Sequence, residues 1–348
     1  MSKIRALALF SGGLDSILAA RVVAAQGIEV LAVKFVTPFF DYDILADIPG
    51  YTRKIREKYG IDVLVEDISA GYLELLHNPQ HGFGKNFNPC IDCKIFMLTR
   101  AREMMAELGA SFLVTGEVLG QRPMSQRLDT LHVISRDSGS RSFLLRPLSA
   151  KLLPETVPEK EGLVDRERLL DFRGRGRSRQ IAMAREFGIG EFPAPAGGCI
   201  LADPILGRRI ARLYGEQLLQ CPKDITVADI RLLLVGRQFI LPGGGWLILG
   251  REEEENERIS GMASMDDALL GMEVRPGPTA LLRLAASSYA DAEIREADLR
   301  LAAGLVVRYG RKEKGVALPG EVVVALSGER RTIIAEPLND SLSAGWML

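Results

Sequence analysis

Short apolar runs and longer amphipathic runs alternate along the first 70 residues of the chain. The apolar runs have the length of buried strands, and β-branched residues are frequent in them. We therefore predict strands at 4–9, 28–36 and 62–68, and helices at 14–26 and 52–59. This alternation predicts an α/β fold with a doubly wound parallel sheet, which binds ligands at the carboxyl ends of its strands.

The pattern is less regular in the next part of the chain. Residues 71–89 contain Gly, Asn and His without periodicity, so we expect a loop there. Helical spacing returns at 91–108 and ends at Gly109. Further expected elements are short strands at 111–115, 131–134 and 143–145, a helix at 179–187, and a basic helix that carries Arg208, Arg209 and Arg212.

The character of the sequence changes near Cys221–Pro222, where short strand-like runs and Gly-rich turns become frequent. We therefore expect two domains, at 1–221 and 222–348, of which the second is the smaller and is α+β or β-rich. The acidic run 252–255 is expected to be a solvated turn. The strands expected in this domain are 238–241, 246–249, 281–285, 304–309 and 321–325.

The overall composition narrows the class of protein. Hydrophobic residues make up 47% and charged residues 26% of the chain, which is typical of a globular protein. No apolar run approaches the roughly 20 residues of a membrane-spanning helix, and no signal-peptide pattern precedes the first strand, so we expect a cytoplasmic protein without a membrane partner. Because the net charge is −1, RNA binding would require a local basic patch.

A Gly-rich turn stands between the first expected strand and the first expected helix. Unpaired N–H groups and the helix dipole make such a turn an anion site, where glycines allow close approach of a phosphate and serines add hydroxyl donors. Asp15 would repel a bare phosphate, which suggests that Mg²⁺ lies between them. The spacing differs from that of a P-loop. The motif S-G-G-x-D-S resembles the PP-loop of the ATP pyrophosphatase superfamily, which cleaves ATP to AMP and pyrophosphate; its residues are Ser11, Gly12, Gly13, Asp15 and Ser16.

Three of the four cysteines lie in settings that suggest chemistry. Cys90 and Cys93 stand three positions apart at an expected helix start, where both thiolates can face one point and are stabilised by the helix dipole. Cys199 follows two glycines, which indicates an exposed loop. Three cysteines with one open position suit a [4Fe–4S] cluster in which the protein holds three irons.

Other interpretations of these cysteines stay open. A persulfide on Cys199 or Cys93 could deliver sulfur, with the partner cysteine releasing it as a disulfide. Structural zinc usually requires four ligands, and there is no nearby pair of histidines. The cysteines could also be small buried apolar residues. We expect Cys221 to be structural.

The ordered motifs of residues 4–215 resemble those of the ATP-dependent tRNA thiolation enzymes, above all the 4-thiouridine synthase and 2-thiouridylase branches. After the PP-loop, the motifs are N-P-C-I-D-C-K at 88–94, T-G-E-V-L-G-Q at 115–121 with Ser125 and Gln126, and A-G-G-C at 196–199. The resemblance implies an ATP- and Mg²⁺-dependent tRNA sulfurtransferase that adenylates a uridine carbonyl oxygen and replaces it with sulfur. The sulfur donor would be inorganic sulfide or a cysteine desulfurase.

The resemblance also implies roles for individual residues. The candidate ATP ligands are Ser11, Gly12, Gly13, Asp15, Ser16, Gly116 and Gln121. The candidate catalytic residues are Asp15, Cys90, Cys93 and Cys199, of which the three cysteines are also the candidate ligands of a [4Fe–4S] cluster. The candidate contacts to the target base and the adenylate are Glu117, Ser125 and Gln126.

A basic segment and the C-terminal domain are the candidate tRNA contacts. Four arginines in a Gly/Ser setting would contact tRNA phosphates, or else form a solvated loop: Arg173, Arg175, Arg177 and Arg179. Residues 239–251, with Asn256, resemble the RNA-binding domain of the NFACT family over roughly 225–290. The alternative is a β-rich domain that forms a homodimer.

The chain also departs from the 4-thiouridine synthases. Their N-terminal RNA-binding domain does not precede the PP-loop here, and no C-terminal rhodanese domain with its own cysteine follows. We therefore expect a cluster rather than a rhodanese-type relay. Two other functions stay open: a PP-loop ligase or sulfur insertase that acts on a small molecule, and a non-catalytic RNA-binding protein with a relic nucleotide site. We expect tRNA to accelerate pyrophosphate release by a tRNA thiolation enzyme but not by a ligase that acts on a small molecule. Absence of ATP binding would favour the non-catalytic RNA-binding protein.

Overall fold

The structure is a computed structural model that describes residues 4–194, 198–215 and 225–348. The chain forms two compact units, residues 1–200 and 201–348, and each unit is described by itself. The domain boundary expected at 221/222 and Cys221 both lie outside the described residues. Among the described helices, none has both the length and the apolar character needed to cross a lipid bilayer.

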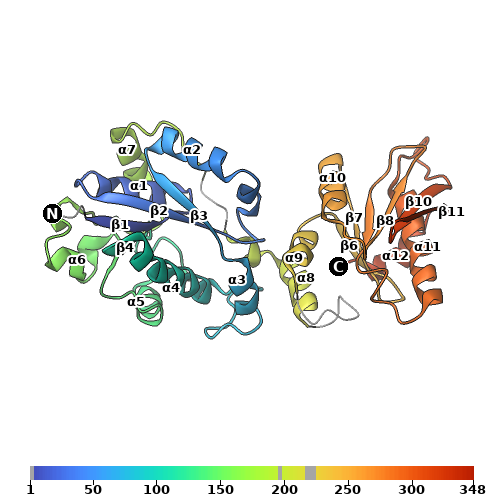
Figure 1. Ribbon diagram of the computed structural model, residues 1–348, viewed down its shortest axis with the longest axis horizontal. Coiled ribbons are helices and arrows are strands. Elements are labelled where there is room, and N and C mark those ends of the chain that lie inside the picture. Colours follow the sequence, from blue (N-terminus) through green and yellow to red (C-terminus); the bar gives the residue numbers. More distant parts are fainter. Residues whose placement is uncertain (1–3, 195–197, 216–224) are drawn as a thin grey trace. The chain divides into compact units, whose positions relative to one another are not determined.

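A five-stranded parallel sheet forms the centre of the first unit (Figure 1). The strand order β3-β2-β1-β4-β5 extends in both directions from β1, so the doubly wound α/β fold expected from the sequence is confirmed. The switch point between β1 and β4 is where such sheets bind ligands. The strands are β1 (Arg5–Leu9), β2 (Glu29–Val36), β3 (Asp62–Asp67), β4 (Phe112–Val114) and β5 (Leu144–Leu145).

Helices cover both faces of this sheet (Figure 1). Successive side chains of β1 point to opposite faces, so Ala6 and Ala8 join the core under α1, whereas Leu7 joins the core under α4. One face carries α1 (Leu14–Ala24), α2 (Ile48–Tyr59) and α7 (Ser178–Glu186), and the other carries α4 (Cys90–Leu108) and α5 (Leu128–Asp137). The shorter helical elements are η1 (Tyr42–Ala46), α3 (Ser69–Leu75), η2 (Ala150–Leu152), α6 (Val157–Lys160), η3 (Arg166–Arg168) and η4 (Ile200–Ala202).

Two expectations for this unit were wrong. The strand expected at 131–134 is part of α5, because Leu131, Ile134 and Ser135 form the buried face of a helix at spacings of three and four. The loop expected at 71–89 is helical at its start, where α3 buries Tyr72 and Leu73. Short apolar runs do not distinguish a strand from one side of a short helix.

The second unit contains a six-stranded antiparallel sheet with α11 packed against it (Figure 1). The strand order is β11-β10-β8-β9-β7-β6. The strands are β6 (Arg237–Ile240), β7 (Trp246–Leu249), β8 (Ala268–Met272), β9 (Ala280–Leu282), β10 (Gly320–Leu326) and β11 (Glu329–Ala335). The helical elements are α8 (Pro204–Tyr214), α9 (Val227–Leu233), α10 (Glu253–Met262), α11 (Ala292–Tyr309), α12 (Asp340–Ser343) and η5 (Ala344–Trp346).

Two expectations for the second unit were also wrong. The run 304–309 is the last part of α11 rather than a strand, and its apolar residues are buried in the core with those of the sheet. The acidic run 252–255 is not wholly solvated, because Glu255 is buried in α10 and accepts hydrogen bonds from Arg251 and from the backbone N–H of Gly236.

Candidate nucleotide and sulfur site

The PP-loop lies at the carboxyl end of β1, in the strand–turn–helix setting that the sequence predicts. Gly12 has a φ of +81°, a conformation that L side chains rarely adopt, so glycine is required there. Ser16 Oγ donates to the carbonyl oxygen of Gly13 at 2.8 Å and accepts from Ser11 Oγ at 3.2 Å. These bonds fix the turn and leave the first N–H groups of α1 at its open end, where an anion can bind.

Asp15 carries one satisfied and one unsatisfied carboxylate oxygen. Its Oδ2 accepts a hydrogen bond of 2.7 Å from Gln121 Nε2, and Gln121 Oε1 in turn accepts from Gln180 at 3.4 Å. Its Oδ1 is buried and has no hydrogen-bond partner among the described residues. Because buried oxygens are normally paired, this oxygen is suited to a ligand such as Mg²⁺, which prefers carboxylate oxygens.

Gly116 brings the segment after β4 into contact with the PP-loop. A Cβ at this position would lie 2.5 Å from both the carbonyl carbon of Asp15 and the nitrogen of Ser16. Any side chain there would therefore push the two loops apart.

Lys34 is a site residue that the sequence analysis missed. It is only 3% exposed, its Nζ donates a 2.9 Å hydrogen bond to the carbonyl oxygen of Ser11, and it forms an ion pair with Asp41. The ammonium group thus holds the PP-loop from the side of β2. A lysine within an otherwise apolar strand run was the available signal.

Glu117 is at the centre of a buried polar cluster beside the PP-loop. Its Oε2 accepts hydrogen bonds from Arg146 Nε at 2.9 Å and from Thr115 Oγ1 at 3.2 Å, and its Oε1 lies 3.7 Å from Lys94 Nζ. Burial alone would raise the pKa of Glu117, but the charges of Arg146 and Lys94 outweigh it, so the pKa is lowered and the carboxylate is ionised. The ion pair between Lys94 and Glu117 connects the start of α4, which carries Cys93, to the segment after β4, which carries Gly116.

Ser125 and Gln126, expected to contact substrate, have different environments. Gln126 is buried, and its Oε1 accepts a 3.0 Å hydrogen bond from the backbone N–H of Arg122, so its amide closes the loop. The carbonyl oxygen of Gln126 also accepts from Gly120 N at 2.7 Å. The Ser125 hydroxyl is buried without a hydrogen-bond partner in the part of the chain that the structure describes.

The three candidate cysteines come from two segments of the first unit. Cys90 and Cys93 occupy the first turn of α4, and Cys199 directly precedes η4. Each residue is half-buried and none forms a disulfide. No three His, Cys, Asp or Glu residues within the described ranges are placed to hold a metal ion.

The acidity of Cys93 differs from the sequence expectation. Its thiol is surrounded by protein, and burial raises its pKa to about 12 despite the opposing effects of Tyr72 and Lys94. At Cys93, desolvation therefore opposes the stabilisation of the thiolate that a helix dipole would give. Iron or another metal can still bind the thiolate by displacing the proton. By donor type, three soft sulfur ligands fit an iron–sulfur cluster.

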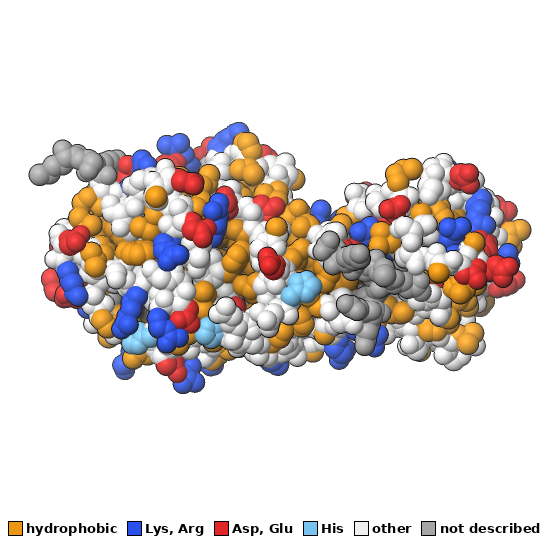
Figure 2. Space-filling model, turned by 60° about the horizontal axis from the view of Figure 1, so that its bottom comes forward, with side chains coloured by type: hydrophobic (Ala, Val, Ile, Leu, Met, Phe, Trp, Pro, Cys, Tyr) orange, Lys and Arg blue, Asp and Glu red, His pale blue; other side chains and the backbone are white. Residues whose placement is uncertain are grey.

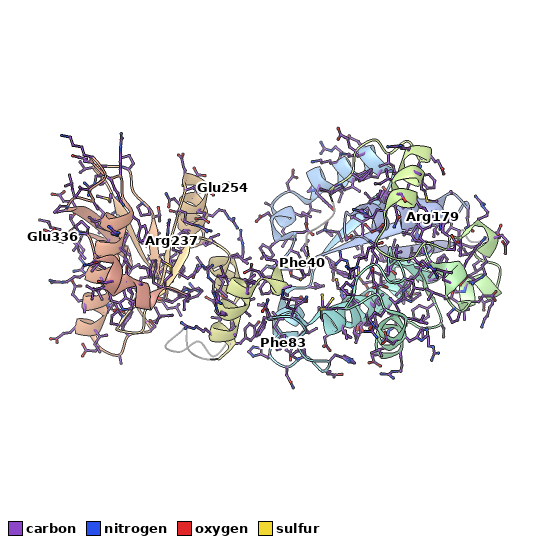
Figure 3. The ribbon with its side chains drawn as sticks, turned by 180° about the vertical axis from the view of Figure 1, so that it is seen from behind. Phe40, Phe83, Arg179, Arg237, Glu254 and Glu336 are labelled. Atoms are coloured by element: carbon purple, nitrogen blue, oxygen red, sulfur yellow. The ribbon has the colours of Figure 1, made fainter. Side chains whose placement is uncertain are left out.

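The arginine segment lies beside the nucleotide-side loop. Arg173 pairs with Leu119 in an isolated parallel bridge, and the backbone N–H of Gly174 donates to the Leu119 carbonyl at 2.8 Å. Arg173, Arg175 and Arg179 are exposed, and Arg177 is half-buried just before α7. Arg179, labelled in Figure 3, stacks over the Phe172 ring at 4.3 Å and forms a 2.6 Å ion pair with Asp171. Charges of both signs are interspersed on the face drawn in Figure 2.

Two family models match this chain. Residues 1–151 match the family described as "Thiamine biosynthesis protein (ThiI)", and residues 236–347 match the family described as "NFACT protein RNA binding domain". Both resemblances inferred from the motifs are thereby confirmed, and the second extends well beyond residue 290.

Curated relatives match part of the chain. A tRNA sulfurtransferase of Desulfurococcus amylolyticus is 30% identical over 144 residues, which are 41% of this chain and 29% of the relative. A probable tRNA sulfurtransferase of Thermococcus kodakarensis is 28% identical over 38% of this chain and 34% of its own length. The tRNA-specific 2-thiouridylase MnmA of Syntrophotalea carbinolica is 32% identical over 32% of this chain and 33% of its own length. The matches thus span about a third of each relative.

Solved structures also resemble the chain. A 4-thiouridine synthetase in complex with RNA and ATP has 21% identity and a TM-score of 0.40, covering 66% of this chain and 52% of the other. The U34-tRNA thiolase NcsA from Methanococcus maripaludis, with its [4Fe–4S] cluster, has 17% identity and a TM-score of 0.34, covering 62% of this chain and 73% of the other.

Proposed function

We propose that the chain is an ATP-dependent tRNA sulfurtransferase that adenylates a uridine carbonyl oxygen and replaces that oxygen with sulfur. The observation that carries this proposal is a continuous set of contacts between the two halves of the site. Gly116 touches the backbone of Asp15 in the PP-loop, and its neighbour Glu117 pairs with Lys94, which follows Cys93. A nucleotide-type loop and a sulfur-bearing helix are therefore held at the same end of one sheet.

The PP-loop would carry out the adenylation. A uracil carbonyl oxygen is a poor leaving group, whereas AMP bound to that oxygen is a good one. The β- and γ-phosphates of ATP would lie on the N–H groups at the start of α1, with the hydroxyls of Ser11 and Ser16 nearby. Asp15, held by Gln121 through Oδ2, would direct its free Oδ1 to Mg²⁺. The tRNA oxygen would attack the α-phosphate and expel pyrophosphate, while the loop N–H groups stabilise the developing charge.

The three cysteines would hold a [4Fe–4S] cluster. Such a cluster, when bound, supplies one iron without a protein ligand, at which a sulfur species can be delivered. Cys90, Cys93 and Cys199 fit such a cluster by donor type. A persulfide mechanism without a cluster is the second candidate.

The tRNA would be bound by two regions. Exposed arginines at 173, 175 and 179 can pair with phosphates next to the loop at 115–126. The second unit, which matches an RNA-binding family, would add affinity. The tRNA sulfurtransferases among the relatives act on the same class of substrate, which supports tRNA over a small molecule.

Pyrophosphate release tests the first half of the proposal. We expect tRNA to accelerate formation of AMP and pyrophosphate from ATP, and Asp15→Ala to abolish it. Asp62→Ala is the matched control, because Asp62 is exposed and pairs with Arg56 at the surface. ATP cleavage that is unchanged in Asp15→Ala would remove the loop from the mechanism. Cleavage that does not respond to tRNA would favour a ligase that acts on a small molecule.

A further inference from the structure

An aromatic pair lies on the loop that joins α3 to α4. The rings of Phe83 and Phe87 pack against each other, with 4.1 Å between their centroids and a tilt of 32°. Phe83, labelled in Figure 3, is 39% exposed, and no other aromatic side chain of the described residues is exposed. A single exposed apolar residue is ordinary, but two packed rings at the surface form an aromatic face to which a flat ligand can bind.

Hydrogen bonds hold this loop against the start of α4. The backbone N–H of His81 donates to Asp92 Oδ2 at 3.0 Å, and Asp92 lies in the first turn of α4. The N–H of Gly84 donates to the carbonyl oxygen of Asn88 at 2.8 Å and closes the turn between the two phenylalanines. The rings are therefore held in place before a ligand arrives, which reduces the entropy lost on binding.

The loop also borders both parts of the proposed site. Phe87 precedes Cys90, the first residue of α4, by three positions. Gly84 touches the loop at 115–126, because a Cβ added to Gly84 would overlap the methyl group of Met124. Met124 directly precedes Ser125, a candidate contact to the target base. The aromatic pair is thus adjacent to the region in which the reacting uridine would lie.

The charge of the loop suits a polyanion. Residues 75–91 contain no Asp or Glu, although the net charge of the whole chain is −1. Lys85 stands between the two phenylalanines in the sequence and is exposed. Sites for single-stranded nucleic acid combine these two elements, a cation that contacts phosphate and a ring that stacks on a base. A protein partner would require a surface of roughly 20 to 30 residues, whereas one base requires only one ring.

We propose that Phe83 and Phe87 form a stacking platform for an unpaired base of the tRNA, next to the uridine that is modified. The inference rests on the proposed function, because it takes tRNA as the substrate. A uridine that enters a reaction site leaves the base stack, so that a neighbouring base loses its stacking partner. An aromatic ring replaces that partner whatever the base is, because every base has a π-face. The platform would stabilise the opened tRNA without selecting its sequence.

Phe83→Leu tests this proposal, because leucine keeps an apolar side chain and removes the ring. Phe83→Trp is the rescue variant, since an indole ring also stacks on a base. Val157→Ala is the control for loss of exposed apolar surface: Val157 is 38% exposed and belongs to α6, which lies well away from α3 in Figure 1. Filter binding of unmodified tRNA to the full chains, over a range of salt concentrations, measures the affinity and the slope of log K against log salt.

The expected result is an affinity for tRNA that is lower by about 5- to 150-fold in Phe83→Leu, the effect of one lost stack between a base and an aromatic ring. The salt slope should equal that of wild type, because no phosphate contact is lost. Phe83→Trp and Val157→Ala should bind tRNA as wild type does. An affinity of Phe83→Leu equal to wild type, or one that falls together with the salt slope, would overturn the proposal.

Fluorescence of the Phe83→Trp protein reports the stack directly. Wild type contains Trp246 and Trp346, and its emission is subtracted. The remaining emission should be quenched when tRNA is added, because a base stacked on an indole ring quenches its fluorescence. An added tryptophan that does not respond to bound tRNA would overturn the proposal even if Phe83→Leu does not fold. A wild-type protein that binds no tRNA would overturn the proposed function as well, whereas the other contrary results overturn the stacking platform alone.

Discussion

Gly116 lies against the backbone of Asp15, so closely that a Cβ on Gly116 would come within 2.5 Å of the Asp15 carbonyl carbon. This contact joins the end of β4 to the turn after β1, the two strands that flank the switch point of the sheet. The geometry of the PP-loop therefore depends on a residue more than a hundred positions away in the sequence.

Gly116→Ala should displace the PP-loop and weaken ATP binding by about 10- to 100-fold, since a shift of about 1 Å at a site can have effects of that size. Gly190→Ala is the matched control, because a Cβ at Gly190 meets no atom within 4 Å. Calorimetric titration with a non-hydrolysable ATP analogue measures the effect. Equal affinities in the two variants would show that the contact does not control the loop.

Glu117→Gln should destabilise the first unit by about 3 kcal/mol at neutral pH, because it leaves Arg146 buried without its counter-charge. Folding lowers the pKa of Glu117, so the ionised carboxylate stabilises the folded state. This stabilisation is complete when the pH is above the ordinary pKa of glutamate, and it is lost as the pH falls through the lowered pKa. The difference in stability between wild type and variant should therefore shrink on acidification below about pH 4.5.

Denaturant unfolding at a series of pH values checks this behaviour. Glu191→Gln is the control, because Glu191 is exposed and pairs with Lys58 at the surface, so no measurable change is expected. A Glu117→Gln protein whose deficit is the same at pH 3 and pH 7 would contradict the assignment of an ionised buried carboxylate.

Cys93→Ser should lose the iron chromophore, because serine does not replace the thiolate ligand of a cluster. Cys221→Ser should keep its iron, since Cys221 is not among the proposed ligands. Iron and sulfide analysis with a visible spectrum after anaerobic reconstitution measures both. Full iron and sulfide in Cys93→Ser would refute the ligand assignment.

Arg175→Gln should weaken tRNA binding and reduce the slope of log K against log salt by about 1, as expected for one lost phosphate contact. Arg179→Gln should change the slope less, because Arg179 is already paired with Asp171 and stacked on Phe172. Filter binding over a range of salt concentrations measures both slopes. Identical slopes in wild type and Arg175→Gln would show that Arg175 does not contact a tRNA phosphate, as expected if the segment is a solvated loop.

The sequence was sufficient to predict the parallel sheet and the position of the PP-loop. Long runs with clear periodicity, such as 28–36 and 91–108, correspond closely to β2 and α4. Runs of four to six apolar residues were not sufficient: 131–134 and 304–309 are helical, because each forms part of a helix that packs on a sheet or on another helix. Such a tertiary context is not visible in a short window.

The candidate site was predictable only in part, for a similar reason. Motifs indicated the loop and the cysteines, but not the residues that hold them. Lys34 reaches the PP-loop from a neighbouring strand, which is a contact between segments distant in sequence. The raised pKa of Cys93 is likewise a consequence of burial, which no local spacing reveals.

The most direct test of the proposed function is nucleoside mass spectrometry of tRNA. Unmodified tRNA would be incubated anaerobically with the reconstituted full chain, ATP, Mg²⁺ and sulfide, and then digested to nucleosides. We predict a thiouridine that forms only with ATP and is absent with Asp15→Ala and with Cys93→Ser. A wild-type protein that cleaves ATP to AMP and pyrophosphate but transfers no sulfur to any tRNA uridine would contradict the proposed function.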